Sequence, residues 1–204
     1  MPSRNVLKID IPETYYHIYA RGGSKLPIFI TSDDFAVFLN LLKRYLSPTP
    51  ERDKSGREYP HLRNKLELLA YCLMPNHFHI LAYQEEAGSM TALMRGLMTS
   101  YSRYFNSAHN RSGPLFESRY KATPIINQAY LEHITRYIHL NPKDWRNYDY
   151  SSIHSYRAVR NEEWLQPERI LGQFKNIAEY MRFVDDYEDH KAMLDKIKHE
   201  LADL

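Results

Sequence analysis

Residues 66–83, LELLAYCLMPNHFHILAY, contain two short apolar runs separated by a turn. The runs 66–73 and 77–83 are rich in residues that favour β-strands, and the Met-Pro-Asn segment 74–76 between them has turn chemistry. Two strands joined by so short a connection pair antiparallel. This stretch therefore predicts a central hairpin in an antiparallel sheet.

Further elements are expected on both sides of this hairpin, from apolar periodicity and from capping and turn residues. Helices are indicated where apolar residues recur every three or four positions, and strands where short aromatic and β-branched runs end in Gly, Pro or Asn. The expected order is a strand at 15–20, a helix from about 33 to 45, a polar, proline-containing loop at 47–63, the hairpin, a helix at 89–105, a strand at 116–126 and a helix at 128–140.

This order predicts an α+β fold. It matches the ferredoxin-like βαββαβ arrangement, in which an antiparallel sheet carries helices on one face. The expected catalytic domain covers residues 1–155, and a mainly helical C-terminal extension covers residues 156–204 and ends in one long charged helix. A chain of 204 residues is long enough for one such domain with an appended segment.

Composition is typical of a water-soluble globular protein. Hydrophobic residues make up 43% and charged residues 25%, and no apolar run approaches the roughly 18 residues of a membrane span. The N-terminus lacks the apolar core of a secretory signal, and the one cysteine, Cys72, cannot form an internal disulfide. We therefore expect a cytoplasmic protein that does not contact membranes.

Charge and aromatic residues are unevenly distributed. The net charge is only +2, but residues 90–121 contain five basic residues against one acid, whereas residues 185–204 contain seven acids and three lysines. The 17 tyrosines and 8 phenylalanines suit stacking on unpaired bases as well as core packing. The basic centre is therefore the segment in which we expect contacts with a polyanion.

His77 and His79 are the first candidate functional residues. Positions i and i+2 of a strand point to the same face, so their two imidazoles would lie side by side. With one or two oxygen donors, such a pair suits a borderline divalent ion, and Mg²⁺ where phosphate oxygens complete the shell. On spacing alone, the commoner interpretation is two polar side chains on the solvated face of a half-buried strand.

Tyr137 and Asn141 are the second pair. Residues four apart share one face of a helix, so the phenol and the amide could reach the same point on the sheet, and the amide oxygen could serve as a third metal ligand. Periodicity alone favours a core position for Tyr137, because it continues a stripe with Tyr130 and Ile134. His139 is not expected to act as a base for Tyr137, because an offset of two residues points it to another side of the helix.

A resemblance to a known family joins these two pairs. The string 71–81, YCLMPNHFHIL, resembles the HUH motif of the bacterial REP-associated tyrosine transposases and their single-tyrosine HUH relatives. Segment 137–142, YIHLNP, resembles the nucleophile helix of that family, and 111–121, RSGPLFESRYK, is similar to its segment R-x-G-x-L-(aromatic)-x-x-R-(aromatic)-K. Residues 16–22 resemble the family's first strand. Segment 148–152, YDYSS, resembles its aromatic-Ser-Ser segment, with tyrosine at position 150 where tryptophan is expected.

The resemblance implies an enzyme that cuts and rejoins single-stranded DNA, including hairpin-forming repeats, through a 5′-phosphotyrosine. It implies that Tyr137 is the nucleophile and that His77, His79 and Asn141 hold Mg²⁺ or Mn²⁺. Contacts with single-stranded or hairpin DNA are expected from five basic residues, namely Arg21, Arg95, Arg103, Arg119 and Lys121.

Three aromatic residues of the helix at 89–105 are candidates for stacking on bases: Tyr101, Tyr104 and Phe105. The alternative is an ordinary solvated helix face, with Arg95 and Arg103, above a core stripe.

Two other functional classes fit the same residues. One is a transposase-derived regulator that binds nucleic acid without cutting it, and the other is a metal-dependent hydrolase that uses water in place of Tyr137. Similarity to the REP-associated branch favours a monomer over a homodimer. A protein of this kind is expected on the bacterial nucleoid when it is bound to DNA.

Overall fold

A computed structural model describes residues 10–186. The charged helix expected at the end of the chain therefore lies outside the described residues. Within them, no helix is both long enough and apolar enough to span a membrane.

The sheet has four antiparallel strands in the order β2-β3-β1-β4. The strands are β1 (Thr14–Arg21), β2 (Leu66–Met74), β3 (His77–Gln84) and β4 (Lys121–Ile125). The first strand lies between the third and the fourth, which is the ferredoxin-like order, so the predicted fold class is confirmed. The predicted hairpin is also confirmed, because β2 and β3 pair along their length around Pro75 and Asn76.

Strand β4 is shorter than the strand predicted at 116–126. It begins at Lys121, and Phe116 makes only an isolated bridge with Gly22. The segment that precedes β4 is therefore a loop that passes the end of β1.

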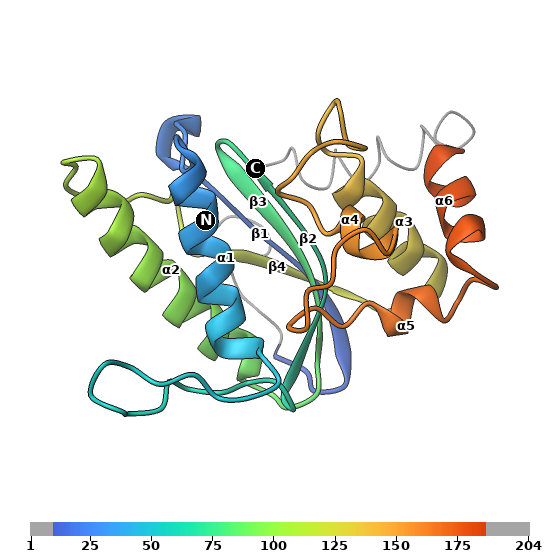
Figure 1. Cartoon of the computed structure of the whole chain (residues 1–204), viewed down its shortest axis with the longest axis horizontal. Helices are drawn as coiled ribbons and strands as arrows, with labels where there is room; N and C mark the ends of the chain where they lie inside the picture. The colour runs from blue at the N-terminus through green and yellow to red at the C-terminus, as the bar shows by residue number, and fades with distance from the viewer. Residues whose placement is uncertain (1–9, 187–204) are drawn as a thin grey trace.

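Two helices of the core, α1 (Ser32–Leu46) and α2 (Ser89–Ala108), pack on one face of the sheet (Figure 1). Helix α1 begins with a capping box between Thr31 and Asp34, which satisfies backbone N–H groups of its first turn. Buried residues of both helices form one core with the side chains that β1 and β3 direct to this side, such as Ile18 and Phe78.

The opposite face is also covered. Helix α3 (Gln128–His139) lies on it with α4 (Ile153–Tyr156), α5 (Glu168–Leu171) and α6 (Ile177–Asp185), as Figure 1 shows. The expectation of helices on one face thus holds for the βαββαβ core but does not describe the whole chain. The second hydrophobic core explains the difference, because α3 and the extension bury the other side of the sheet there.

Residues 150–152 run beside the edge strand β2. The backbone N–H of Leu73 donates to the carbonyl of Tyr150 (2.9 Å), and the N–H of Ser152 donates to the carbonyl of Tyr71 (3.0 Å). Tyr156 and Tyr180 of the extension are fully buried in the same core as helix α3. The division of the chain at residues 155 and 156 stays a prediction.

Candidate active site

The register of the sheet places both histidines near the end of the β2–β3 hairpin. His79 pairs with Tyr19 of β1, and His77 pairs with Arg21 at the end of that strand. Their ring centroids are 5.0 Å apart, and both side chains lie on the face that α3 covers. His79 is buried, whereas His77 is half-buried at the margin of the site.

Helix α3 brings Tyr137 to the histidines, and Asn141 follows just after the helix, which ends at His139 and not at residue 140 as expected. The helix begins at the cap residue Asn127, whose side chain accepts from the N–H of Tyr130, and its stripe of apolar residues faces the sheet. The ring of Tyr137 is 5.3 Å from that of His79, and Oδ1 of Asn141 is 3.3 Å from Nε2 of His77. The i, i+4 spacing therefore does bring both side chains to one point, and Tyr137 is half-buried beside the site.

His77, His79 and Tyr137 line a cavity of about 180 Å³, and Asn141 reaches its margin through the contact with His77. Three of the predicted DNA-binding residues line it, namely Arg21, Arg119 and Lys121. They come from the end of β1, the loop before β4 and the start of β4. Glu117 of the same loop is the one acid among the lining residues, so the rim is basic on balance.

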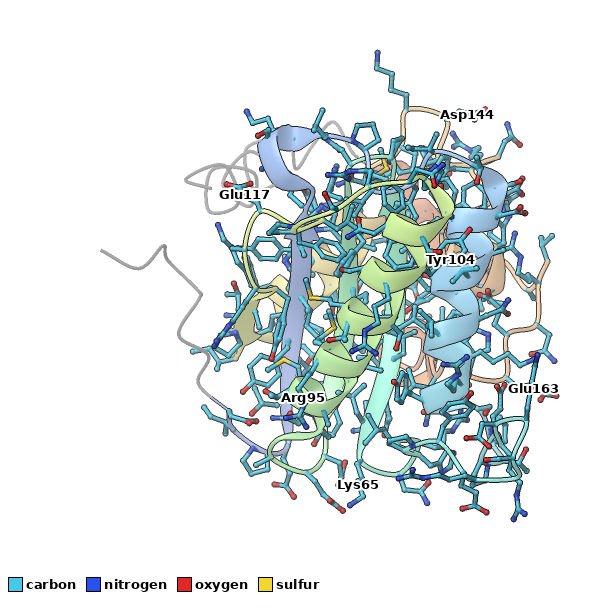
Figure 2. The ribbon with its side chains drawn as sticks, turned by 90° about the vertical axis from the view of Figure 1, so that its left-hand side faces the viewer. Lys65, Arg95, Tyr104, Glu117, Asp144 and Glu163 are labelled. Carbon is cyan, nitrogen blue, oxygen red and sulfur yellow. The ribbon has the colours of Figure 1, made fainter. Side chains whose placement is uncertain are left out.

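Arg95 and Arg103 do not line this cavity. They lie on α2 and border a separate, larger groove of about 1040 Å³, which shares the loop residues 117–119 with the cavity. Figure 2 labels Arg95 on α2 and Glu117 on the loop that leads to β4. The predicted basic residues thus border two neighbouring hollows, and Arg119 lines both of them.

The stacking role expected for Tyr101 and Phe105 is wrong. Both side chains are fully buried in the core between α1, α2 and the sheet, and the Tyr101 hydroxyl donates to the carbonyl of Ile28. They belong to the core stripe of α2, whose 3.6-residue period could not distinguish them from exposed aromatics. Tyr104 is partly exposed and remains a candidate.

Burial controls the protonation of the site. Desolvation lowers the pKa of His77, and it lowers the pKa of His79 well below its usual range. The positive charge of Arg21 acts in the same direction on both rings. Both imidazoles are therefore neutral at neutral pH, which is the form that binds metal ions. Burial also raises the pKa of Tyr137 to about 12, against the hydrogen bond from Asn141 and the charge of Arg21, which lower it.

His17 was missed by the sequence analysis as a member of this site. It is buried in β1, and its Nε2 lies 3.0 Å from Nδ1 of His79. Burial lowers its pKa to about 3, so it is also neutral. The signal that could have found it is the strand period, because His17, Tyr19 and Arg21 share one face of β1.

Side chains that neighbour Tyr137 in sequence fasten α3 to the rest of the chain. His139 contacts the hydroxyl of Tyr180 through Nδ1 (2.6 Å) and Oγ of Ser152 through Nε2 (2.8 Å). Fully buried Arg136 donates to the carbonyl of Phe183 near the end of α6 (3.0 Å). His139 thus points away from the phenol, as its helical offset predicted.

The donor set at the cavity fits a divalent ion. No cluster of three or more His, Cys, Asp or Glu side chains suited to a metal occurs between residues 10 and 186. Two neutral imidazoles and an amide oxygen nevertheless meet at the site, because Oδ1 of Asn141 lies beside the ring of His77. Nitrogen and neutral oxygen donors with open positions suit a borderline ion such as Mn²⁺, or Mg²⁺ when phosphate oxygens take part.

Comparison with known proteins shows which family this chain resembles over the site. The model of the family described as "Transposase IS200 like" matches residues 58–141, a range that includes both HUH histidines, Tyr137 and Asn141. This match confirms the recognition made from the sequence, the resemblance to single-tyrosine transposases, over the part of the chain that carries the site. A comparison with curated proteins gave no match.

Two solved structures are similar to this chain. The structure of the REP-associated tyrosine transposase bound to a REP hairpin is 15% identical with a TM-score of 0.53, and the match covers 78% of this chain and 94% of that one. It shows the same fold. A protein of Deinococcus radiodurans r1 solved as a presumed transposase is 16% identical with a TM-score of 0.39, and covers 64% of this chain and 93% of its own.

Proposed function

We propose that this protein is a transposase that cleaves and rejoins single-stranded DNA at hairpin-forming repeats, by transesterification through a 5′-phosphotyrosine at Tyr137. The observation that carries the proposal is that Tyr137, His77 and His79 line one cavity with basic residues, while Asn141 contacts His77 beside it. Hairpin DNA as the substrate is supported by the REP-associated transposase of the same fold, whose structure contains a REP hairpin.

In the proposed reaction, the Oη of Tyr137 attacks the phosphorus of a phosphodiester in the cavity. The Tyr137 Oη–P bond forms while the P–O3′ bond breaks, the phenol proton is lost, and the departing 3′ oxygen takes up a proton. The product is a 5′-phosphotyrosine and a free 3′-hydroxyl. A 3′-hydroxyl of another strand can then attack the phosphotyrosine and release Tyr137, so joining needs no nucleotide cofactor.

Tyr137 needs help to ionise, because burial keeps the pKa of its phenol near 12. Asn141 and the charge of Arg21 both act in the required direction, since each lowers that pKa. His77, His79 and Asn141 would hold Mg²⁺ or Mn²⁺, and such an ion supplies Lewis-acid polarisation and neutralises negative charge on the phosphate. The guanidinium of Arg21, at the rim of the cavity, would also neutralise negative charge on the phosphate.

The basic residues that border the two hollows suggest a path for the DNA. Arg21, Arg119 and Lys121 would contact phosphates next to the cleaved bond, and Arg95 and Arg103 would contact more distant ones along the groove on α2. Because Tyr137 meets the histidines of its own chain, the geometry supports a monomer as the active unit. Binding to repeats would place the protein on the bacterial nucleoid.

The test is to incubate the protein with Mn²⁺ and labelled single-stranded hairpins taken from repeats that flank its own gene, followed by denaturing electrophoresis. We expect a protein-linked DNA band for the wild type and for the control Tyr59→Phe, and no such band for Tyr137→Phe or in EDTA. Cleaved DNA without an adduct would favour the hydrolase. Native complexes without any cleavage would favour the regulator.

A further inference from the structure

We propose that His17 is a positioning residue that holds His79 in the ring tautomer required of a metal ligand. The inference rests on the proposed function, because it concerns the same metal site. It concerns a side chain outside the ligand set predicted from the sequence.

The contact between the two rings is built into the centre of the sheet. Nε2 of His17 is 3.0 Å from Nδ1 of His79, and the rings are stacked with centroids 5.1 Å apart. In the β1–β3 register His79 pairs with Tyr19, so His17 is its diagonal neighbour on the same face. Both side chains are at most 4% exposed, and the pairing of two adjacent strands fixes their separation.

His17 lies behind His79 as seen from the cavity. His79 is among the residues that line the cavity, whereas His17 is not. Its ring nitrogen Nε2 is directed to His79, and the edge of its ring also meets Tyr137 at a centroid distance of 6.2 Å. His17 is therefore placed to act through His79 and not to serve as another ligand.

One hydrogen lies between these two nitrogens, and its position decides whether His79 can bind an ion. If Nδ1–H of His79 donates to Nε2 of His17, then Nε2 of His79 keeps its lone pair for a metal. If Nε2–H of His17 donates instead, the proton of neutral His79 sits on Nε2 and blocks coordination. A metal-binding His79 thus requires His17 to accept at Nε2 and to carry its own proton on Nδ1.

Removal of this acceptor should weaken metal binding without touching a ligand. Partners of ligating histidines fix the tautomer and ring orientation, and their loss costs about 10- to 100-fold in metal affinity. His17→Phe keeps an aromatic ring but lacks the acceptor nitrogen. His17→Gln places an amide oxygen that can accept from His79, so it should restore part of the affinity.

The experiment is a Co²⁺ titration of the full-length protein without DNA, followed by calorimetry and visible absorption. We expect His17→Phe to bind Co²⁺ about 10- to 100-fold more weakly than wild type, His17→Gln to lie between them, and the control His61→Phe, in the loop between α1 and β2, to match wild type. Equal affinity of wild type and a folded His17→Phe would overturn the inference.

Nitrogen-15 NMR of the wild type tests the tautomer directly and does not depend on how the variants fold. We expect protons on Nδ1 of both His79 and His17, and a proton on Nε2 of His79 would contradict the proposal. If wild type binds no Co²⁺ although Tyr137 still forms a DNA adduct, the metal site is wrong, whereas loss of the adduct alone contradicts the proposed reaction.

Discussion

Tyr180→Phe removes a single hydroxyl from α6 and probes how the extension supports helix α3, which carries Tyr137. The Tyr180 hydroxyl contacts Nδ1 of His139 at 2.6 Å, and His139 reaches Oγ of Ser152 at 2.8 Å through its other nitrogen. Ser152 in turn accepts from the N–H of Tyr71 in β2 at 2.9 Å. The chain of contacts therefore runs from α6 through α3 to the sheet.

The expected cost follows from the burial of both partners. The ring of Tyr180 keeps its packing in the variant, so only the hydroxyl is lost. One hydrogen bond contributes about 1 kcal/mol net, and a buried group left without a partner costs about 1–3 kcal/mol. His139 is fully buried, so we expect the upper part of this range. For a protein of this size, each kcal/mol lowers Tm by about 2–4 °C.

The assay is urea unfolding monitored by circular dichroism, with thermal melts in parallel. The control is Tyr59→Phe, which removes the hydroxyl of a tyrosine in the loop between α1 and β2 whose ring lies under Arg44. Because the extension and α3 share one core, wild type should unfold in a single transition. The reasoning is refuted if Tyr180→Phe is as stable as the control, or if the extension unfolds separately without any effect on α3.

Three further predictions concern other parts of the site's framework. Burial tends to raise the pKa of Asp34, but N–H donors of Thr31 and Ile30 and the side chain of His109 outweigh it and the pKa is lowered. The ionised carboxylate of Asp34 therefore stabilises the fold above about pH 4. We expect Asp34→Asn to lower the free energy of unfolding measured in urea at pH 7, and this loss should shrink as the pH falls through the lowered pKa of Asp34. Gly22→Ala should cost about 1–3 kcal/mol in thermal melts, because the new Cβ would lie 2.1 Å from the carbonyl oxygen of Leu26; an unchanged Tm would contradict this. Arg136→Met should loosen α6, since it removes the donor to the carbonyl of Phe183. Amide exchange in α6 should then be faster in the variant than in wild type, while exchange in α2 stays the same.

Local patterns in the sequence determined much of the candidate site. The strand period placed His77 and His79 on one face, and the helical period placed Tyr137 beside Asn141, because each rule joins residues only two or four positions apart. The order of elements around the hairpin likewise predicted the ferredoxin-like sheet. The resemblance to single-tyrosine transposases then connected the two pairs, which no local rule could do.

Other features were decided by the tertiary structure. The contact between His17 and His79 joins residues 62 positions apart and depends on the register of β1 against β3. Helical periodicity places Tyr101 and Phe105 on one stripe of the helix, but it does not decide whether that stripe faces DNA bases or the core. Packing of α2 against α1 and the sheet buries both side chains. The sequence determined which residue types share a face, because that depends on local backbone geometry, whereas the partners of each face depend on how distant elements pack.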